Sequence, residues 1–365
     1  MNSEKLAEVS NKLFKAEQAV NTQNSLNQLM KHLGGLVNQP NNPEVQTALS
    51  EAREKFRGNL ASLISTFPPK DLERVGELDP SGFFADELAD RFDQIIEANA
   101  MTPEVARSEI ETVSQNRKQF IDALGRLVSS LEFFELGYSE LDEGSVEIGV
   151  QIPREMFGNN LTGLRNELRD FSLIAGWFSE AVAGERKEIT VESISTSDPL
   201  FMFSLADAAT IAALAKAFEW ALGCWEKVEN IRKLRAETAA SGEFSDEEIE
   251  EFFGSKVKAT VENAVSEKLS DLSEEHQLEN KPELKSHLET GLNWIVSKTE
   301  HGYSVELRLP AFDQELEIEQ EQEDGSPTSP LSELRRIQGQ LVFPKFEGNT
   351  VLEIPDLSDD ASESE

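Results

Sequence analysis

The stretch 188–236 constrains the fold most, because two short apolar strands and a long apolar helix follow one another there. Ile189 and Val191 alternate with polar residues, which is typical of a β-strand. After a polar turn, the almost unbroken apolar run from Leu200 to Leu205 predicts a central strand rather than an edge strand. We therefore expect a β-hairpin that leads directly into a helix.

That helix is predicted to begin at Asp207, whose carboxylate can accept from the first unpaired amides, and to end near residue 236. Apolar side chains recur along it at three- and four-residue steps, which places them on one face: Ile211, Leu214, Phe218, Leu222, Trp225 and Val228. Two interpretations remain open. The helix lies on a small sheet as part of the core, or Trp220 and Trp225 leave the core and anchor an interface with a partner.

The region before the hairpin divides into two parts. Residues 1–138 have helical periodicity throughout, with a loop at 39–43, a stop at Pro68-Pro69, and a start signal at Thr102-Pro103. If this region self-associates, residues 3–36 should expose an apolar stripe. From residue 139 the period changes, because apolar and polar residues alternate over 144–152, which predicts a half-buried strand.

Residues 139–311 are predicted to form an α+β domain with the order strand, helix, strand, strand, helix. Two further helices follow within 245–299, and we expect the alternating segment 303–309 to join the same sheet. The predicted fold class is therefore mainly α with an α+β part. A helical region precedes a small mixed or antiparallel sheet that long helices cover.

The end of the chain has a different composition. Residues 312–330 are predicted to be an acidic flexible linker, in which Leu316 and Ile318 alternate with glutamates, so that an edge strand and a disordered segment both stay open. A small C-terminal β-hairpin is predicted within 331–355, with its turn at 347–349. Residues 356–365 are rich in Asp, Ser and Glu and are predicted to be a disordered tail.

No motif in the sequence indicates catalysis, a cofactor or a metal site. The four histidines are not spaced as a local zinc pair, and Cys224, within the long helix, is predicted to be a buried structural thiol. The turn at Ser195, Ser197 and Asp198 could line a pocket, although a solubilised hairpin turn is the favoured interpretation. Carboxylates from distant positions could also meet in space.

The formal net charge of −35 limits the choice of partner. Phosphate binding needs clustered Lys and Arg, so the charge argues against nucleic acid as a direct ligand, and an acidic surface disfavours anionic membranes. Lys216 and Glu219 interrupt the most apolar helix, which argues against a membrane span. The charge favours a basic protein partner. A single cysteine and an N-terminus without a secretory signal predict a cytoplasmic protein.

Three hypotheses about function follow. The first is a non-enzymatic interaction or scaffold protein that acts through amphipathic helices and forms homo-oligomers. The second is an acidic decoy, in which Glu315, Glu317 and Glu319 imitate a phosphate backbone and occupy a basic, nucleic-acid-binding surface of a partner. The third is an enzyme whose site is assembled from distant residues.

Overall fold

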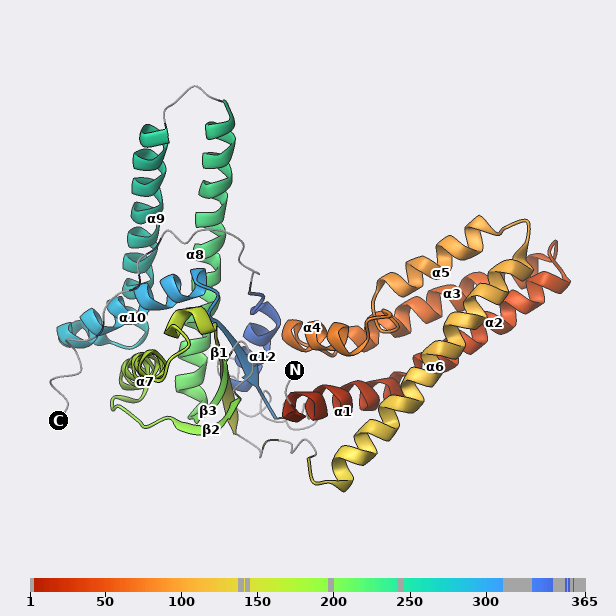
Figure 1. The fold of residues 1–365 in the computed structure, drawn as a ribbon, viewed down its shortest axis with the longest axis horizontal. Coiled ribbons are helices and arrows are strands. Elements are labelled where there is room, and N and C mark those ends of the chain that lie inside the picture. Colours follow the sequence, from red (N-terminus) through yellow and green to blue (C-terminus); the bar gives the residue numbers. More distant parts are fainter. Residues whose placement is uncertain are drawn as a thin grey trace. The chain divides into compact units, whose positions relative to one another are not determined.

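The computed structural model describes residues 3–136, 141, 145–195, 200–241, 246–310, 330–343, 352, 354 and 357. The chain divides into two compact units, Met1–Ser139 and Glu140–Glu365, which are described separately below as unit 1 and unit 2 (Figure 1). The fold class is the predicted one, since helices dominate both units and unit 2 adds a small antiparallel sheet.

The described part of unit 1 consists of helices: α1 (Ser3–Val20), α2 (Thr22–Asn38), α3 (Pro43–Ile64), α4 (Pro69–Leu78), α5 (Glu87–Ala98) and α6 (Pro103–Phe133). Their apolar faces are buried against one another. Phe56 and Phe92, for example, place their rings 5.4 Å apart between α3 and α5. Asn21 adopts a left-handed backbone (φ 57°) that separates α1 from α2.

Two local details of unit 1 differ from the sequence interpretation. The sequence pattern predicts that Pro68-Pro69 stops a helix, but Pro69 is also the first residue of α4. Proline is tolerated there because the backbone amide of a first-turn residue makes no hydrogen bond within the helix. Thr102 was predicted to cap α6 through its side chain. Its backbone carbonyl accepts from the Val105 amide instead, and its hydroxyl oxygen accepts no cap hydrogen bond from the first-turn amides.

In unit 2 the described residues form a four-stranded antiparallel sheet with the order β2-β3-β1-β4. The strands are β1 (Val146–Ile152), β2 (Thr190–Ser195), β3 (Leu200–Ala206) and β4 (Ser304–Arg308). β2 and β3 form the predicted hairpin, β3 is central as expected, and β4 joins the sheet beside β1. The register shifts between Val191 and Ser193, so Glu192 is the extra residue of a β-bulge.

Long helices pack on the sheet and on one another: α7 (Leu161–Ala183), α8 (Ala208–Ser241), α9 (Asp246–Glu275) and α10 (Pro282–Glu300). The short 3-10 turns Arg154–Phe157 and Leu278–Asn280 connect them to their neighbours. Asp207 caps α8 as predicted, because its carboxylate accepts from the Thr210 amide at 3.1 Å and from the Thr210 hydroxyl at 2.8 Å. Gly184 ends α7 with φ 79°.

β1 is more deeply buried than its alternating sequence predicts. Six of its seven residues are buried, including Glu147. The Glu147 carboxylate accepts from the Arg308 guanidinium at 3.1 Å across the strand pair, and the Ser304 hydroxyl donates to Gln151 at 3.0 Å. Polar side chains can therefore occupy the second face because cross-strand partners satisfy them.

The C-terminal part also differs from the sequence interpretation. Residues Pro330–Gln340, placed partly in the hairpin region, form helix α12. Leu341–Phe343 are not a strand, and 344–351 lie outside the described residues. Leu357, assigned to a disordered tail, is buried in the core of unit 2, because an apolar side chain gains free energy there. The acidic linker from 312 to 329 lies outside the described residues.

Candidate interaction surfaces

The residues singled out from the sequence lie on two elements of unit 2 or outside the described residues. Trp220 and Trp225 are both half-buried on α8, and Trp220 packs against the core. The Trp225 Nε1 atom is buried and has no hydrogen-bond partner among the residues that the structure describes. Ser195 is half-buried at the end of β2. Ser197, Asp198, Glu315, Glu317 and Glu319 lie outside the described residues, so their proposed roles remain predictions.

The apolar stripe of residues 3–36 is interior rather than exposed. Its members pack inside unit 1, with less than 2% of the surface of each accessible: Val9, Leu13, Leu26, Leu29 and Leu33. The expectation that a self-associating protein would expose this stripe is therefore not met. Self-association, if it occurs, uses another surface.

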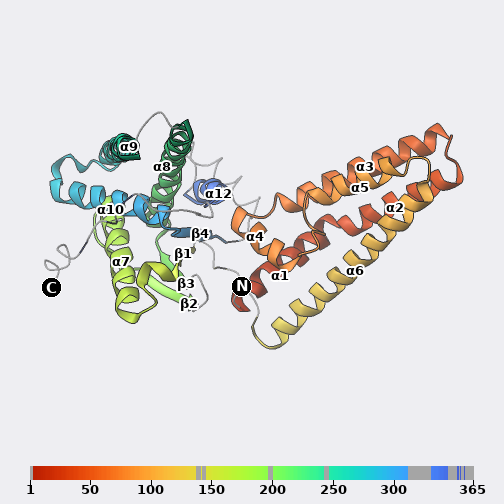
Figure 2. The same ribbon diagram turned by 45° about the horizontal axis from the view of Figure 1, so that its top comes forward.

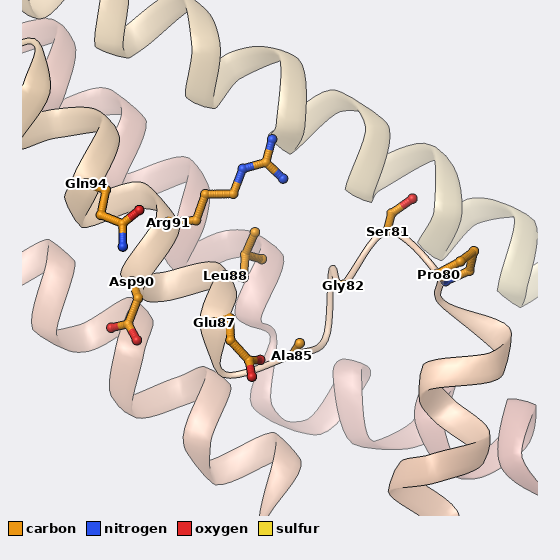
Figure 3. Close-up of a pocket in the computed structure, with 9 residues that line it drawn as sticks. All are labelled: Pro80, Ser81, Gly82, Ala85, Glu87, Leu88, Asp90, Arg91 and Gln94. Atoms are coloured by element: carbon orange, nitrogen blue, oxygen red, sulfur yellow. The ribbon is translucent and has the colours of Figure 1, made fainter.

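A pocket of about 530 Å³ lies in unit 1, between the turn that follows α4 and the first turns of α5 (Figure 3). It is lined by Pro80, Ser81, Gly82, Ala85, Glu87, Leu88, Asp90, Arg91 and Gln94. Figure 3 shows Arg91 and the Ser81 hydroxyl on one side and the carboxylates of Glu87 and Asp90 on the other.

The turn at this pocket is held by buried polar groups. The Asp79 carboxylate accepts from the Phe84 amide at 2.8 Å, and burial raises the pKa of Asp79. Arg117, fully buried on α6, donates to the Phe83 carbonyl at 3.1 Å and to Glu17 at 2.9 Å.

The polar side chains that line the pocket are all exposed, and Asp90 is already paired with Arg57 at 2.7 Å. Ligand sites usually place a few buried polar groups so that they fix the orientation of a ligand. The pocket therefore offers a small molecule little more than the single cation of Arg91. We do not assign the function to it.

Charged residues from distant positions do meet in unit 2, as the third hypothesis requires. Lys298 on α10 donates to both carboxylate oxygens of Glu167 on α7, at 2.6 and 2.7 Å. Tyr303 lies nearby, and its buried hydroxyl forms no hydrogen bond within the described part of unit 2. Burial raises its pKa, and the charges of Glu167 and Asp170 raise it further. No sequence pattern indicates this cluster, since Glu167 lies 131 residues before Lys298.

This cluster is closed to a substrate. Lys298 is 2% exposed, Glu167 7% and Tyr303 0%. Burial raises the pKa of Glu167 more than the neighbouring ammonium lowers it. A buried, bidentate ion pair with no access from solvent holds α7 and α10 together and does not act on a ligand.

A second buried ionic group lies in unit 1. The Glu8 carboxylate on α1 accepts from Lys5 at 2.7 Å and from Lys12 at 2.8 Å, and Lys12 also donates to Asp71 on α4 at 2.8 Å. Burial alone would raise the pKa of Glu8, but the two ammonium groups outweigh it and lower the pKa to about 2. This network joins α1 to α4 and is structural.

The far half of α8 and the near half of α9 form a two-helix arm that runs away from the sheet (Figures 1 and 2). We define the arm as residues 226–241 and 246–262. Its seam consists of buried apolar side chains from both helices: Val228, Ile231, Phe253, Val257 and Val261. Two large apolar side chains on the arm are exposed, Leu234 at 48% and Phe252 at 61%.

The α8 helix connects the arm rigidly to the core. Ile211 and Leu214, in its first two turns, are fully buried against the sheet region. The same helix continues without interruption to Ser241, for 34 residues, which corresponds to about 50 Å of helix. The Trp220 and Trp225 side chains lie between these two ends and stay half-buried.

The described residues contain no group of three or more His, Cys, Asp and Glu side chains that could hold a metal ion. Cys224 is buried on α8, as predicted, and burial raises the pKa of its thiol to about 11. Within the described part of the chain, every helix is too short or too polar to cross a lipid bilayer.

Comparison with models of protein families, with curated proteins and with solved structures finds no match for this chain. The geometry of the chain itself is therefore the basis for the function proposed below.

Proposed function

We propose that the protein is a non-enzymatic interaction or scaffold protein that binds a protein partner through the helical arm. The observation that carries this proposal is the arm itself. Its two helices pack through one apolar seam, and a continuous helix attaches it to the core. It exposes the side chains of Leu234 and Phe252. We place it in the cytoplasm, where its single cysteine would remain a reduced thiol.

The physical reason lies in what such an arm can do. A two-helix projection buries one stripe of each helix and leaves the other faces accessible, so it offers a large surface for its length. Because α8 runs from the core to the arm, a bound partner would be held at a fixed distance and angle from the sheet. Amphipathic helices also bind partner helices through apolar anchors, and exposed Leu and Phe side chains are suited to that role.

The test compares full-length variants in the source cell. We expect the wild-type chain to co-purify with a specific protein, or to form a defined oligomer by light scattering. Leu234→Glu combined with Phe252→Glu should abolish that association. The matched control, Met101→Glu combined with Leu161→Glu, removes two apolar side chains elsewhere that are more exposed, at 94% and 85%, and should leave the association intact.

Circular dichroism would verify that all variants keep their helix content. A strictly monomeric wild-type chain that retains no protein would overturn the proposal. So would an association that the arm variant keeps, because the interaction would then lie on another surface.

The acidic decoy is tested separately, since its key residues lie outside the described residues. It predicts salt-sensitive binding to a basic protein that is lost when residues 313–324 and 356–365 are deleted. Binding that survives both deletions would eliminate it. Loss of binding in the arm variant with these segments intact would favour the first hypothesis instead.

A further inference from the structure

The two edge strands of the sheet in unit 2, β4 and β2, differ in what packs against them. On the β4 side, α12 lies against the strand, and the Gln338 side-chain amide donates to the Leu307 carbonyl at 2.7 Å. On the β2 side, no described strand continues the sheet. In an antiparallel edge strand, alternate residues direct their amides and carbonyls outward, so β2 presents about three residues with unused backbone groups.

The β-bulge gives this open edge an apolar face. Residues three apart in a regular strand lie on opposite faces, but the extra residue Glu192 brings Val191 and Ile194 to the same face. The register of β2 against β3 shows that this is the face that packs on the core. Val191 lies opposite Ser204, in the row of Ile148 and Leu307.

Ile194 belongs to the corresponding second row. It lies opposite Met202, beside Val150 and Val305. The apolar members of both rows on the central strands and on β4 are at most 6% exposed, whereas Val191 and Ile194 are 49% and 51% exposed. The core face of the sheet therefore extends one strand beyond the helices that cover it.

The charges beside β2 are mostly unpaired carboxylates. Arg186 is paired with Glu180 at 2.8 Å, and Lys187 lies 3.8 Å from the Asp207 carboxylate. By contrast, three exposed carboxylates at and near the strand take part in no ion pair with any described residue: Glu185, Glu188 and Glu192. The charge left uncompensated along this edge is therefore negative.

We propose that β2 binds an extended basic segment of a partner protein, which adds to the sheet as a fifth strand. Backbone hydrogen bonds along the open edge would hold the segment. Its apolar side chains would cover Val191 and Ile194, and its Lys or Arg side chains would face the three carboxylates. This site is independent of the arm.

The same charges argue against two other occupants. A second copy of β2 would bring Glu192 and its neighbours against identical carboxylates. The chain's own segment 313–324 carries glutamates at alternate positions and no basic residue, so it would also be repelled. A bulge that carries a charge is a recognised protection of edge strands against self-pairing, and here it leaves the edge open to the opposite charge.

The experiment uses the full-length protein and synthetic ten-residue peptides that alternate valine with lysine. A second peptide replaces lysine by glutamate, and a third carries prolines that prevent strand pairing. Fluorescence anisotropy should show binding of the lysine peptide alone, weakened by salt. Amide hydrogen exchange should show new protection confined to residues 190–195.

Two variants test charge and shape separately. Glu188→Lys combined with Glu192→Lys should weaken binding of the lysine peptide by at least about tenfold and confer binding of the glutamate peptide. Ile194→Ser should weaken binding of the lysine peptide without changing its salt dependence. The arm variant, Leu234→Glu with Phe252→Glu, is the matched control and should bind the peptide as the wild type does.

Several outcomes would overturn the proposal. Equal binding of the proline peptide would show a diffuse attraction to an acidic protein. Protection outside 190–195 would place the site elsewhere. Protection of the β2 amides without peptide that disappears when residues 313–324 are deleted would identify the chain's own segment as the occupant. Protection that disappears on dilution would identify a second copy of the chain. If the arm variant keeps the association tested above, the proposal for the β2 edge is unaffected, because it depends on different residues.

Discussion

The buried pair of Glu167 and Lys298 gives a sharp test of the reasoning about unit 2. Lys298→Met removes the ammonium and keeps the volume of the side chain, so a buried carboxylate loses the cation with which it is paired. Both carboxylate oxygens are engaged, at 2.6 and 2.7 Å, and the two side chains are 2% and 9% exposed. Breaking such a pair costs about 3–5 kcal/mol of unfolding free energy.

Removing both charges should cost much less. In Glu167→Leu combined with Lys298→Met, no charge remains to be desolvated, and replacement of a buried pair by apolar residues is often neutral or stabilising by about 1–4 kcal/mol. The two single substitutions should therefore be strongly non-additive, which a double-mutant cycle measures directly.

The single variant should also depend more strongly on pH than the wild type, in which burial already raises the pKa of Glu167. Without Lys298, burial raises the pKa of Glu167 further above its unfolded value of 4.5. The folded state then binds a proton more tightly than the unfolded state. Stability should be greatest below pH 4.5 and should fall as the pH rises through the raised pKa.

The assay is urea unfolding followed by tryptophan fluorescence, because the Trp294 ring lies 5.2 Å from the Lys298 ammonium. Hydrogen exchange of α10 would confine the measurement to unit 2, since two units need not unfold together. A cost below about 1 kcal/mol with the same pH dependence as the wild type, or additive single substitutions, would refute the assignment of this cluster as a buried structural pair.

Three further predictions concern packing and protonation. Gly163→Ala should destabilise unit 2 by about 1–3 kcal/mol, because a Cβ atom there would lie 2.2 Å from the Phe157 carbonyl oxygen; an unchanged melting temperature would contradict this. The pKa of Glu8, lowered to about 2, supplies stability above pH 4.5 that disappears toward pH 2, and Glu8→Gln should flatten the acid limb of a denaturation profile. Cys224 should react with iodoacetamide at pH 8 only after unfolding, because burial raises its pKa to about 11; rapid labelling of the native chain would show access that the fold does not provide.

The local elements of unit 2 were predictable because neighbouring residues determine them. The apolar run at 200–205 predicted a central strand. Asp207 predicted the start of α8, because its carboxylate accepts from the amide of Thr210, three residues further along the chain. Alternation at 303–309 likewise predicted a strand that could join the sheet. In each case the period of apolar residues, or one side chain and a nearby amide, contains the required information.

Failures occurred where distant contacts outweigh local pattern. The alternation in β1 predicted an exposed polar face, but Arg308, far along the chain, pairs with Glu147 and allows that face to be buried. Residues 330–340 differ in this respect, because Leu331, Leu334 and Ile337 recur at three-residue steps, a local period that is compatible with a helix. The segment is helical, and Leu334 and Ile337 are buried in the core.

What the sequence determined by itself was most of the helices and strands before residue 310, together with a negative net charge that limits the choice of partners, because periodicity and charge are properties of the chain alone. Only the tertiary structure decided which surfaces are available. It buried the apolar stripe of residues 3–36, placed α12 against one sheet edge, left the β2 edge without a further strand from the described residues, and extended α8 beyond the core into an arm. Exposure depends on which elements pack together, and residues far apart in the sequence determine that packing.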